Sequence, residues 1–251
     1  MGCAGAADGI WQADTRLARE LGLRSSIHMG AAGRGPKFQA IKRMQEQGFL
    51  GPDLTFVHCN TSSDDELRMM ADNGVTASLG VQVEQVTLAY GDVPVDRLMD
   101  VGIRPSLSSD TETKGAGDMF TQMRAVLSHY RASRTNGHSR TRNTPEMLTT
   151  RDVLEMATIV GAEANGMASS VGSLTPGKKA DLIFIRADDL NLMPVTDPVA
   201  AIVTAAHPGN VDSVMVDGRF RKRHGRMLFD NLAELRARAH ASQHYLYQDG
   251  R

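Results

Sequence analysis

Residues 53–60 read DLTFVHCN, a short apolar run that ends near His58, and this pattern predicts a buried β-strand. A helix is predicted on each side of this strand, over 36–48 and over 62–74, because apolar residues recur there at helical spacing and each segment ends at a glycine. The chain around His58 is therefore predicted to run helix, strand, helix.

The same alternation continues in both directions along the chain. Further strands are predicted over 24–30, 75–81 and 103–110, and further helices over 14–23, 93–102 and 118–133. Strands and helices that alternate about every thirty residues are typical of parallel βαβ units. The first two thirds of the chain are therefore predicted to form an α/β domain whose parallel strands end near His28, His58, Gly80 and Asp110.

The sequence pattern changes near residue 135. Residues 134–147 are polar and rich in turn formers, which predicts a long surface loop, and a helix is predicted over 149–167. Short strands separated by glycine turns are predicted over 172–188 and 211–228, and an amphipathic helix over 231–246. The last third of the chain is therefore predicted to hold a small β region followed by a helix.

The composition excludes several classes of protein. Hydrophobic residues make up 41% of the 251 residues and charged residues 23%, which argues against a disordered chain. A net charge of -1 provides no broad basic surface, so neither nucleic acid nor a membrane is expected as a partner. Two cysteines, no apolar run of membrane-spanning length and no signal-peptide pattern favour a cytoplasmic protein.

Three side chains are candidates for chemistry because each lies at the end of a predicted strand: His28, His58 and Asp110. In parallel α/β folds the active site gathers at the carboxyl ends of the strands. Imidazole and carboxylate groups are the usual ligands of a hydrolytic zinc or iron ion, which lowers the pKa of bound water. Any one of these residues alone would be read as a buried polar group, but three strand ends together favour a shared site.

Five stretches carry a family resemblance: IHMG (27–30), FVHCN (56–60), LSSDTETKGAGDMF (107–120), LTTRDVLEMATIVGAEANGM (148–167) and VGSLTPGKKADLIFI (171–185). Together they resemble the C-terminal part of an amidohydrolase-superfamily enzyme of the cytosine deaminase and chlorohydrolase type. The last stretch is the most specific, because the family returns from its barrel to a side β-sandwich through a Gly-x-Leu-x-x-Gly-Lys-x-Ala-Asp-Leu segment. The resemblance covers nearly the whole chain.

The resemblance implies an α/β fold of the (β/α)8 TIM-barrel type with a β-sandwich beside it. This chain would hold the C-terminal half of the barrel, strands five to eight, and part of the sandwich. Residues 1–170 would be a partial metal-dependent hydrolase barrel, 171–229 the sandwich portion and 230–251 a C-terminal helix.

The resemblance also implies roles for the three strand-end residues. His28 would end strand five and ligate a divalent metal, zinc first and iron as the alternative. Asp110 would end strand eight, ligate the metal and shuttle the catalytic proton. His58 would end strand six and contact the attacking water or the leaving group of the substrate.

Two features depart from the family pattern. The chain contains no His-x-His pair, which the family carries on strand one, and only 27 residues precede His28. We therefore expect a truncated chain or one that a partner completes. On its own it should bind metal weakly, show low or no activity, and form homo-oligomers or self-associate through open sheet edges. Deaminase-type members often carry Glu three residues after the strand-five His, where this chain has Ala31. Glu84 could replace it as a substrate contact, or could be an ordinary polar loop residue.

The main functional hypothesis is a metal-dependent amidohydrolase that acts on a small molecule. It would hydrolyse a non-peptide C–N bond of a heterocyclic or amide substrate by metal-activated water, as a deaminase does, or act in a chlorohydrolase-like way. The alternative is a non-catalytic remnant, or a subunit that needs a partner chain to complete the barrel. A third hypothesis is nucleotide binding through the glycine-rich AAGRGPK segment (31–37).

Overall fold

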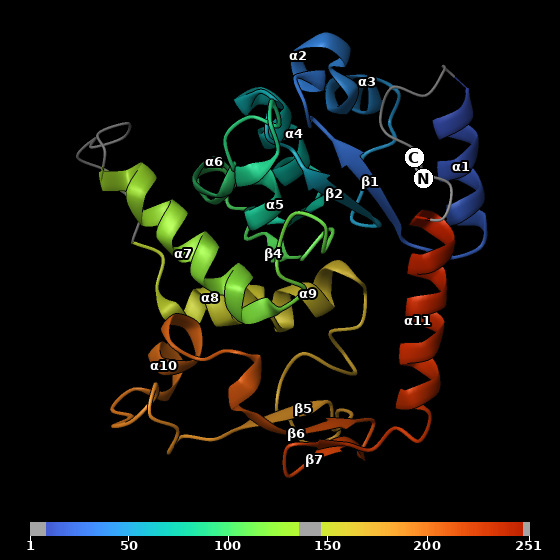
Figure 1. Ribbon diagram of the computed structural model, residues 1–251. Helices are drawn as coiled ribbons and strands as arrows, with labels where there is room; N and C mark the ends of the chain where they lie inside the picture. Colours follow the sequence, from blue (N-terminus) through green and yellow to red (C-terminus); the bar gives the residue numbers. More distant parts are fainter. Residues whose placement is uncertain (1–8, 136–146, 248–251) are drawn as a thin grey trace. The chain divides into compact units, whose positions relative to one another are not determined.

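The computed structural model describes residues 9–135 and 147–247 (Figure 1). Most of the loop predicted over 134–147 lies outside these described residues. These described residues divide into two compact units, one made of residues 9–135, 147–178 and 187–208, the other of residues 179–186 and 209–247.

A parallel sheet forms the centre of the first unit. Its strands are β1 (Ser25–Met29), β2 (Leu54–His58), β3 (Thr76–Leu79) and β4 (Ser106–Leu107). They lie in the order β1-β2-β3-β4, and every neighbouring pair is parallel. The prediction of four parallel strands in chain order is confirmed, although β4 is much shorter than the strand predicted over 103–110.

Ten α-helices are described in the first unit. They are α1 (Ile10–Glu20), α2 (Arg34–Phe38), α3 (Ala40–Glu46), α4 (Asp64–Asp72), α5 (Val81–Val86), α6 (Val95–Asp100), α7 (Met119–Thr135), α8 (Thr150–Met156), α9 (Ile159–Ala164) and α10 (Pro198–Thr204). Helix α4 begins at a capping box, in which the Ser63 hydroxyl accepts the Glu66 N–H and the Glu66 carboxylate accepts the Ser63 N–H. This cap fixes where the loop after β2 ends.

Two of the predicted helices are broken in the structure. The helix predicted over 36–48 is interrupted at Gln39, whose φ of 42° is left-handed and cannot continue a right-handed helix. The helix predicted over 149–167 is α8 followed by α9, because the backbone at Thr158 leaves the helical region at φ -131° and ψ -93°. Hydrophobic periodicity runs through both breaks, which is why the sequence pattern did not reveal them.

The core of the first unit surrounds the sheet. The side chains of Leu54, Phe56, Leu67, Met70 and Leu79 are all 0% exposed. Burial of a side chain of this size contributes about 1.5–3 kcal/mol, so these residues hold the strands rigidly in place. A rigid sheet is what gives the side chains at its carboxyl edge fixed positions.

The second unit is built on an antiparallel sheet. Its strands β5 (Leu182–Ile185), β6 (Val211–Val216), β7 (Arg219–Arg223) and β8 (Arg226–Met227) lie in that order. The predicted hairpin at Asp217-Gly218 joins β6 to β7, and both of its residues have a positive φ, as such a turn requires. Helix α11 (Leu232–Tyr247) follows, and none of its residues is buried.

No helix within the described ranges is both long enough and apolar enough to cross a membrane.

Candidate functional site

The three strand-end residues converge in the structure. The rings of His28, on β1, and His58, at the end of β2, are stacked with their centroids 5.1 Å apart and their planes 19° apart. Nε2 of His58 lies 3.9 Å from Oδ2 of Asp110, which follows β4. The expectation that these side chains share one edge of the sheet is therefore confirmed, while their individual chemical roles stay predictions.

His58 is held from behind by a buried carboxyl group. Its side chain is 1% exposed, and its Nδ1 lies 2.9 Å from Oε1 of Glu84, whose side chain is 0% exposed. The same oxygen accepts a hydrogen bond of 2.9 Å from the N–H of Gly80. Tyr90 meets the imidazole edge-on, with the ring centroids 5.2 Å apart. The ring of His58 is thus fixed on several sides.

The backbone at two of the strand ends is strained. His58 has a φ of 78°, Cys59 a φ of 57° and Asp110 a φ of 55°. Residues other than glycine rarely adopt this left-handed conformation, which costs about 1–3 kcal/mol and persists only where the surrounding structure enforces it. Such strain clusters at functional sites, so it supports a role for this edge of the sheet.

Gly80 gives Asp110 the room it needs. A Cβ atom placed on Gly80 would lie 2.9 Å from the Cβ of Asp110, closer than real Cβ contacts. Gly80 also donates its N–H to Glu84. This glycine therefore helps to set the positions of two side chains that approach His58.

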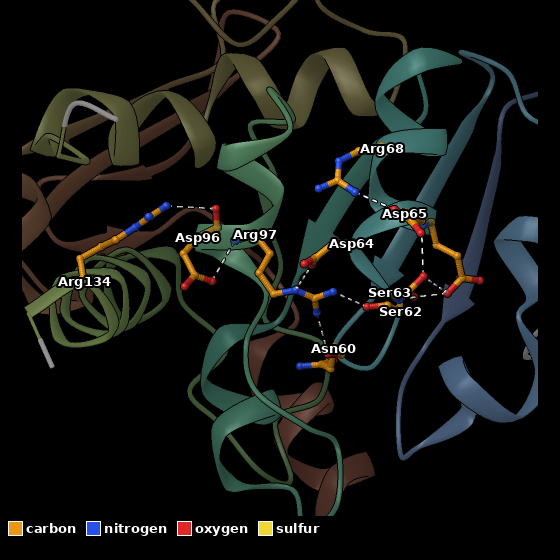
Figure 2. Close-up of polar contacts among 10 residues, drawn as sticks. Asn60, Ser62, Ser63, Asp64, Asp65, Arg68, Asp96, Arg97 and Arg134 are labelled. Carbon is orange, nitrogen blue, oxygen red and sulfur yellow. Dashed lines mark hydrogen bonds and ion pairs between the residues drawn. The ribbon is translucent and has the colours of Figure 1, made fainter. Parts of the chain in front are cut away.

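The β2–α4 loop, residues 59–63, is anchored by Arg97 of α6. Figure 2 shows the guanidinium group of Arg97 between Asn60, Ser62 and Asp64. It donates to the main-chain carbonyls of Asn60 and Ser62, and its Nε lies 2.7 Å from Oδ1 of Asp64. Because the loop follows directly on His58, the last residue of β2, these hydrogen bonds also help to fix the orientation of the His58 side chain.

A small cavity opens beside the two histidines. Its volume is about 230 Å³, and its lining includes His28, His58, Ala31, Arg34 and Glu66. Ligand pockets usually begin at roughly 300 Å³, so this cavity suits only a small molecule or part of one. Ala31, where the family resemblance led us to look for a Glu, forms part of the wall of this cavity.

The electrostatics of the site favour a neutral His28. Burial lowers its pKa, the neighbouring His58 lowers it further, and Asp110 partly opposes both effects. A neutral imidazole keeps a nitrogen lone pair for a metal ion or a proton. Burial raises the pKa of the Cys59 thiol, and Cys59 is 0% exposed, so it is a packed thiol.

The strand-end residues fit part of a metal site. His28 and Asp110 offer the imidazole nitrogen and carboxylate oxygen that zinc and iron bind in hydrolases. Within residues 9–135 and 147–247, however, no group of three or more His, Cys, Asp or Glu side chains is arranged to hold a metal ion. The donor types match a divalent metal, and the described residues supply an incomplete set.

Glu84 does not lie in a loop, contrary to the expectation from the sequence. It belongs to α5, not to a loop, and its fully buried side chain contacts His58 rather than lining the cavity beside the two histidines. Direct contact between Glu84 and a substrate stays a prediction. Sequence reasoning did not find Tyr90 or Arg97, because their contacts with the site join residues far apart in the chain.

The model of the amidohydrolase family matches residues 15–221 of this chain. Among curated proteins, the 5-methylthioadenosine/S-adenosylhomocysteine deaminase of Symbiobacterium thermophilum is 32% identical over 83% of this chain and 48% of its own length. The 5'-deoxyadenosine deaminase of Methanosarcina barkeri is 32% identical over 72% of this chain and 39% of its own length. The chain thus spans about half the length of these relatives, or less.

Two solved structures show the same fold. An adenosine deaminase from Xanthomonas campestris with bound zinc gives a TM-score of 0.87 at 21% identity, over 98% of this chain and 56% of that one. An atrazine chlorohydrolase from Arthrobacter aurescens complexed with zinc gives a TM-score of 0.81 at 21% identity, over 96% of this chain and 54% of that one. Together with the family match, these likenesses indicate an α/β fold of the TIM-barrel type.

Proposed function

Because the chain belongs to the amidohydrolase family, we propose that it carries the C-terminal half of a metal-dependent hydrolase barrel. Strands β1 to β4 would be barrel strands five to eight, and the antiparallel sheet would be part of the side β-sandwich. The proposed activity is hydrolysis of a non-peptide C–N bond in a small heterocyclic or amide substrate, of the deaminase or chlorohydrolase-like type.

The names of the relatives suggest the first substrates to test. Curated relatives at about one third identity are named as deaminases of 5-methylthioadenosine, S-adenosylhomocysteine and 5'-deoxyadenosine. An amino-substituted purine nucleoside is therefore the first candidate class. These names also favour a hydrolase over the alternative hypothesis of a non-catalytic remnant.

The residues of this chain would divide the chemistry among them. His28 and Asp110 would contribute ligands to a divalent metal ion, zinc or iron, which when bound lowers the pKa of a water molecule toward neutrality. Asp110 would take the proton of the attacking water and return it to the leaving group. His58 would hold the water or the leaving group through its Nε2 atom.

The observation that carries this proposal is the position of His58. It lies between the carboxyl groups of Glu84 and Asp110, stacks on His28 and lines the cavity of about 230 Å³. A buried imidazole between two carboxyl groups, at the carboxyl edge of a parallel sheet, is suited to proton transfer and to hydrogen bonding with a bound substrate.

The test is turnover by the purified 251-residue chain with added zinc. Because the described residues supply an incomplete set of metal ligands, we expect ammonia release from 5-methylthioadenosine or 5'-deoxyadenosine to be slow, and it is measured by a coupled assay with excess zinc. Asp110→Asn should lower kcat at least about 100-fold, because general acid–base catalysis contributes about 10²–10⁴-fold. Asp53→Asn is the control, since Asp53 pairs with Arg19 away from the site and its loss should leave turnover unchanged. Undiminished turnover in Asp110→Asn would contradict the proposed role of Asp110, and turnover of a chlorotriazine but of neither nucleoside would contradict the proposed substrate class.

A further inference from the structure

We propose that Glu84 is a positioning residue that fixes the tautomer of His58, with the proton on Nδ1 and the lone pair of Nε2 directed toward Asp110. This inference concerns the site of the proposed function and deepens it. It rests on the contacts of the two side chains, and its first test needs neither a substrate nor a metal. Failure of the proposed activity and failure of this inference can therefore be told apart.

The hydrogen-bond pattern determines which partner donates. Oε1 of Glu84 accepts the N–H of Gly80 at 2.9 Å, and a main-chain N–H can only donate. The second contact of this oxygen is Nδ1 of His58, also at 2.9 Å. An oxygen that already acts as an acceptor toward Gly80 is best satisfied by a second donor, so Nδ1 of His58 carries the proton.

Burial makes this choice of tautomer strong. The side chain of Glu84 is 0% exposed and that of His58 1%, so water does not compete for either nitrogen or oxygen. The stack on His28 and the edge contact with Tyr90 leave the imidazole little room to turn over. In a neutral ring with the proton on Nδ1, Nε2 has a free lone pair.

The free lone pair faces a second acceptor. Nε2 of His58 and Oδ2 of Asp110 are 3.9 Å apart, which is too long for a direct hydrogen bond. Two acceptors at this separation can share a donor placed between them, such as a water molecule or the amino group of a substrate. Glu84 thus prepares His58 to accept a hydrogen bond or proton, without touching the substrate itself.

Glu84 is also costly for the fold. Its Oε2 is buried and has no hydrogen-bond partner among the described residues. Leaving such an atom unsatisfied costs about 1–3 kcal/mol. The other oxygen of this carboxyl group, Oε1, contacts His58. Because the unsatisfied Oε2 destabilises the fold, the carboxyl group is better explained by its effect on the histidine than by a contribution to stability.

His129 provides a control inside the same molecule. Its Nδ1 lies 3.3 Å from the amide nitrogen of Gln85, which can only donate, and its Nε2 lies 3.2 Å from the carbonyl oxygen of Val93, which can only accept. His129 should therefore carry its proton on Nε2. The structure predicts opposite tautomers for His58 and His129.

The experiment is a long-range proton–nitrogen NMR correlation on the chain labelled with ¹⁵N in histidine. It is run at about pH 8, above the ordinary histidine pKa of about 6.5, with a chelator present. His58→Gln and His129→Gln assign the two rings. We expect the Nδ1–H pattern for His58 and the Nε2–H pattern for His129. An Nε2–H pattern for His58 in the parent chain overturns the proposal, whatever the variants of Glu84 do.

Two substitutions of Glu84 sharpen the test. In Glu84→Gln the side-chain carbonyl oxygen should still accept the hydrogen bond from the Gly80 N–H. The flipped amide would bring its NH2 group, also a donor, against this N–H. His58 then keeps its tautomer. Glu84→Leu removes the acceptor, so His58 should populate the Nε2–H form while His129 stays unchanged. Retention of a pure Nδ1–H pattern in Glu84→Leu would contradict the proposal.

Kinetics then separate positioning from substrate contact. In a Ser-His-Asp catalytic triad, a histidine with its proton on the wrong nitrogen lowers kcat about 10⁴-fold. We expect Glu84→Leu to lower kcat at least about 100-fold with KM changed less than about threefold, and Glu84→Gln to restore kcat to within about tenfold of the parent. A rise in KM with kcat unchanged would show instead that Glu84 binds the substrate.

Discussion

Replacing Arg97 by Met should destabilise the first unit by about 2–3 kcal/mol. The guanidinium group donates to the carbonyls of Asn60 and Ser62, and hydrogen bonds from a charged group contribute about 1.5–3 kcal/mol each when well formed. The bond to Asn60 is long, at 3.4 Å, and the Arg97 side chain is 31% exposed, so the two together are worth less than the full sum. The pair with Asp64, which is 62% exposed, adds at most about 1 kcal/mol.

Arg68 is the matched control for this substitution. It too is an arginine paired with an aspartate of α4, but Arg68 is 60% exposed, Asp65 is 82% exposed, and no main-chain carbonyl is involved (Figure 2). Arg68→Met should therefore change stability by less than about 0.5 kcal/mol.

The assay for both variants is thermal unfolding followed by circular dichroism. For a chain of this size, 1 kcal/mol corresponds to about 2–4 °C, so Arg97→Met should lower Tm by roughly 4–12 °C and Arg68→Met by less than about 2 °C. Arg97→Lys should recover less than half of the loss, because an ammonium group cannot serve both carbonyls in the same planar geometry. Equal Tm values for Arg97→Met and Arg68→Met would refute the conclusion that Arg97 anchors the β2–α4 loop.

Two further predictions concern packing and pH. A Cβ on Gly35 would lie 2.0 Å from the carbonyl oxygen of Thr61, so Gly35→Ala should lower Tm by the equivalent of about 1–3 kcal/mol. A Cβ on the helical Gly161 would meet only the carbonyl oxygen of Met156, at 3.9 Å, so Gly161→Ala should raise stability by about 0.5–1 kcal/mol. The hydrogen bond from Arg19 holds the pKa of Asp53 below its usual value, so the pair stabilises the fold above about pH 4 and this contribution is lost as the pH falls through the lowered pKa. Urea unfolding of the parent and of Asp53→Asn should differ by less than about 1 kcal/mol at pH 7, and the difference should shrink below about pH 4; a difference that grows on acidification would contradict this assignment.

The parts of the site that the sequence predicted are those that local patterns encode. An apolar run that ends in a polar residue identifies both a strand and its carboxyl end, which is why His28, His58 and Asp110 were predicted to converge. Glu84 was expected in a loop, either as a substrate contact or as an ordinary polar residue, because a short helix of only six residues leaves little periodicity to recognise. Its contact with His58 joins positions 26 residues apart, and no local pattern encodes such a pairing.

The helix breaks had a different cause. Apolar residues continue at helical spacing through Gln39 and Thr158, so periodicity alone predicts one helix in each place. The backbone there is set by packing in three dimensions, which overrides local preference. Helix α10 was missed as well, although Asp197 caps its first turn by accepting the N–H groups of Val199 and Ala200.

The left-handed backbone at His58, Cys59 and Asp110 has a consequence for how the chain can change over time. Glycine or asparagine would relax these positions, so a search for heat-resistant variants that ignored turnover would drift toward those replacements. Such variants would have a higher melting temperature, but at His58 and Asp110 they would lose the side chains to which we assign the proposed chemistry. In a lineage that still uses the site, His58 and Asp110 should resist substitution, and they should be among the first positions to vary once the site falls out of use.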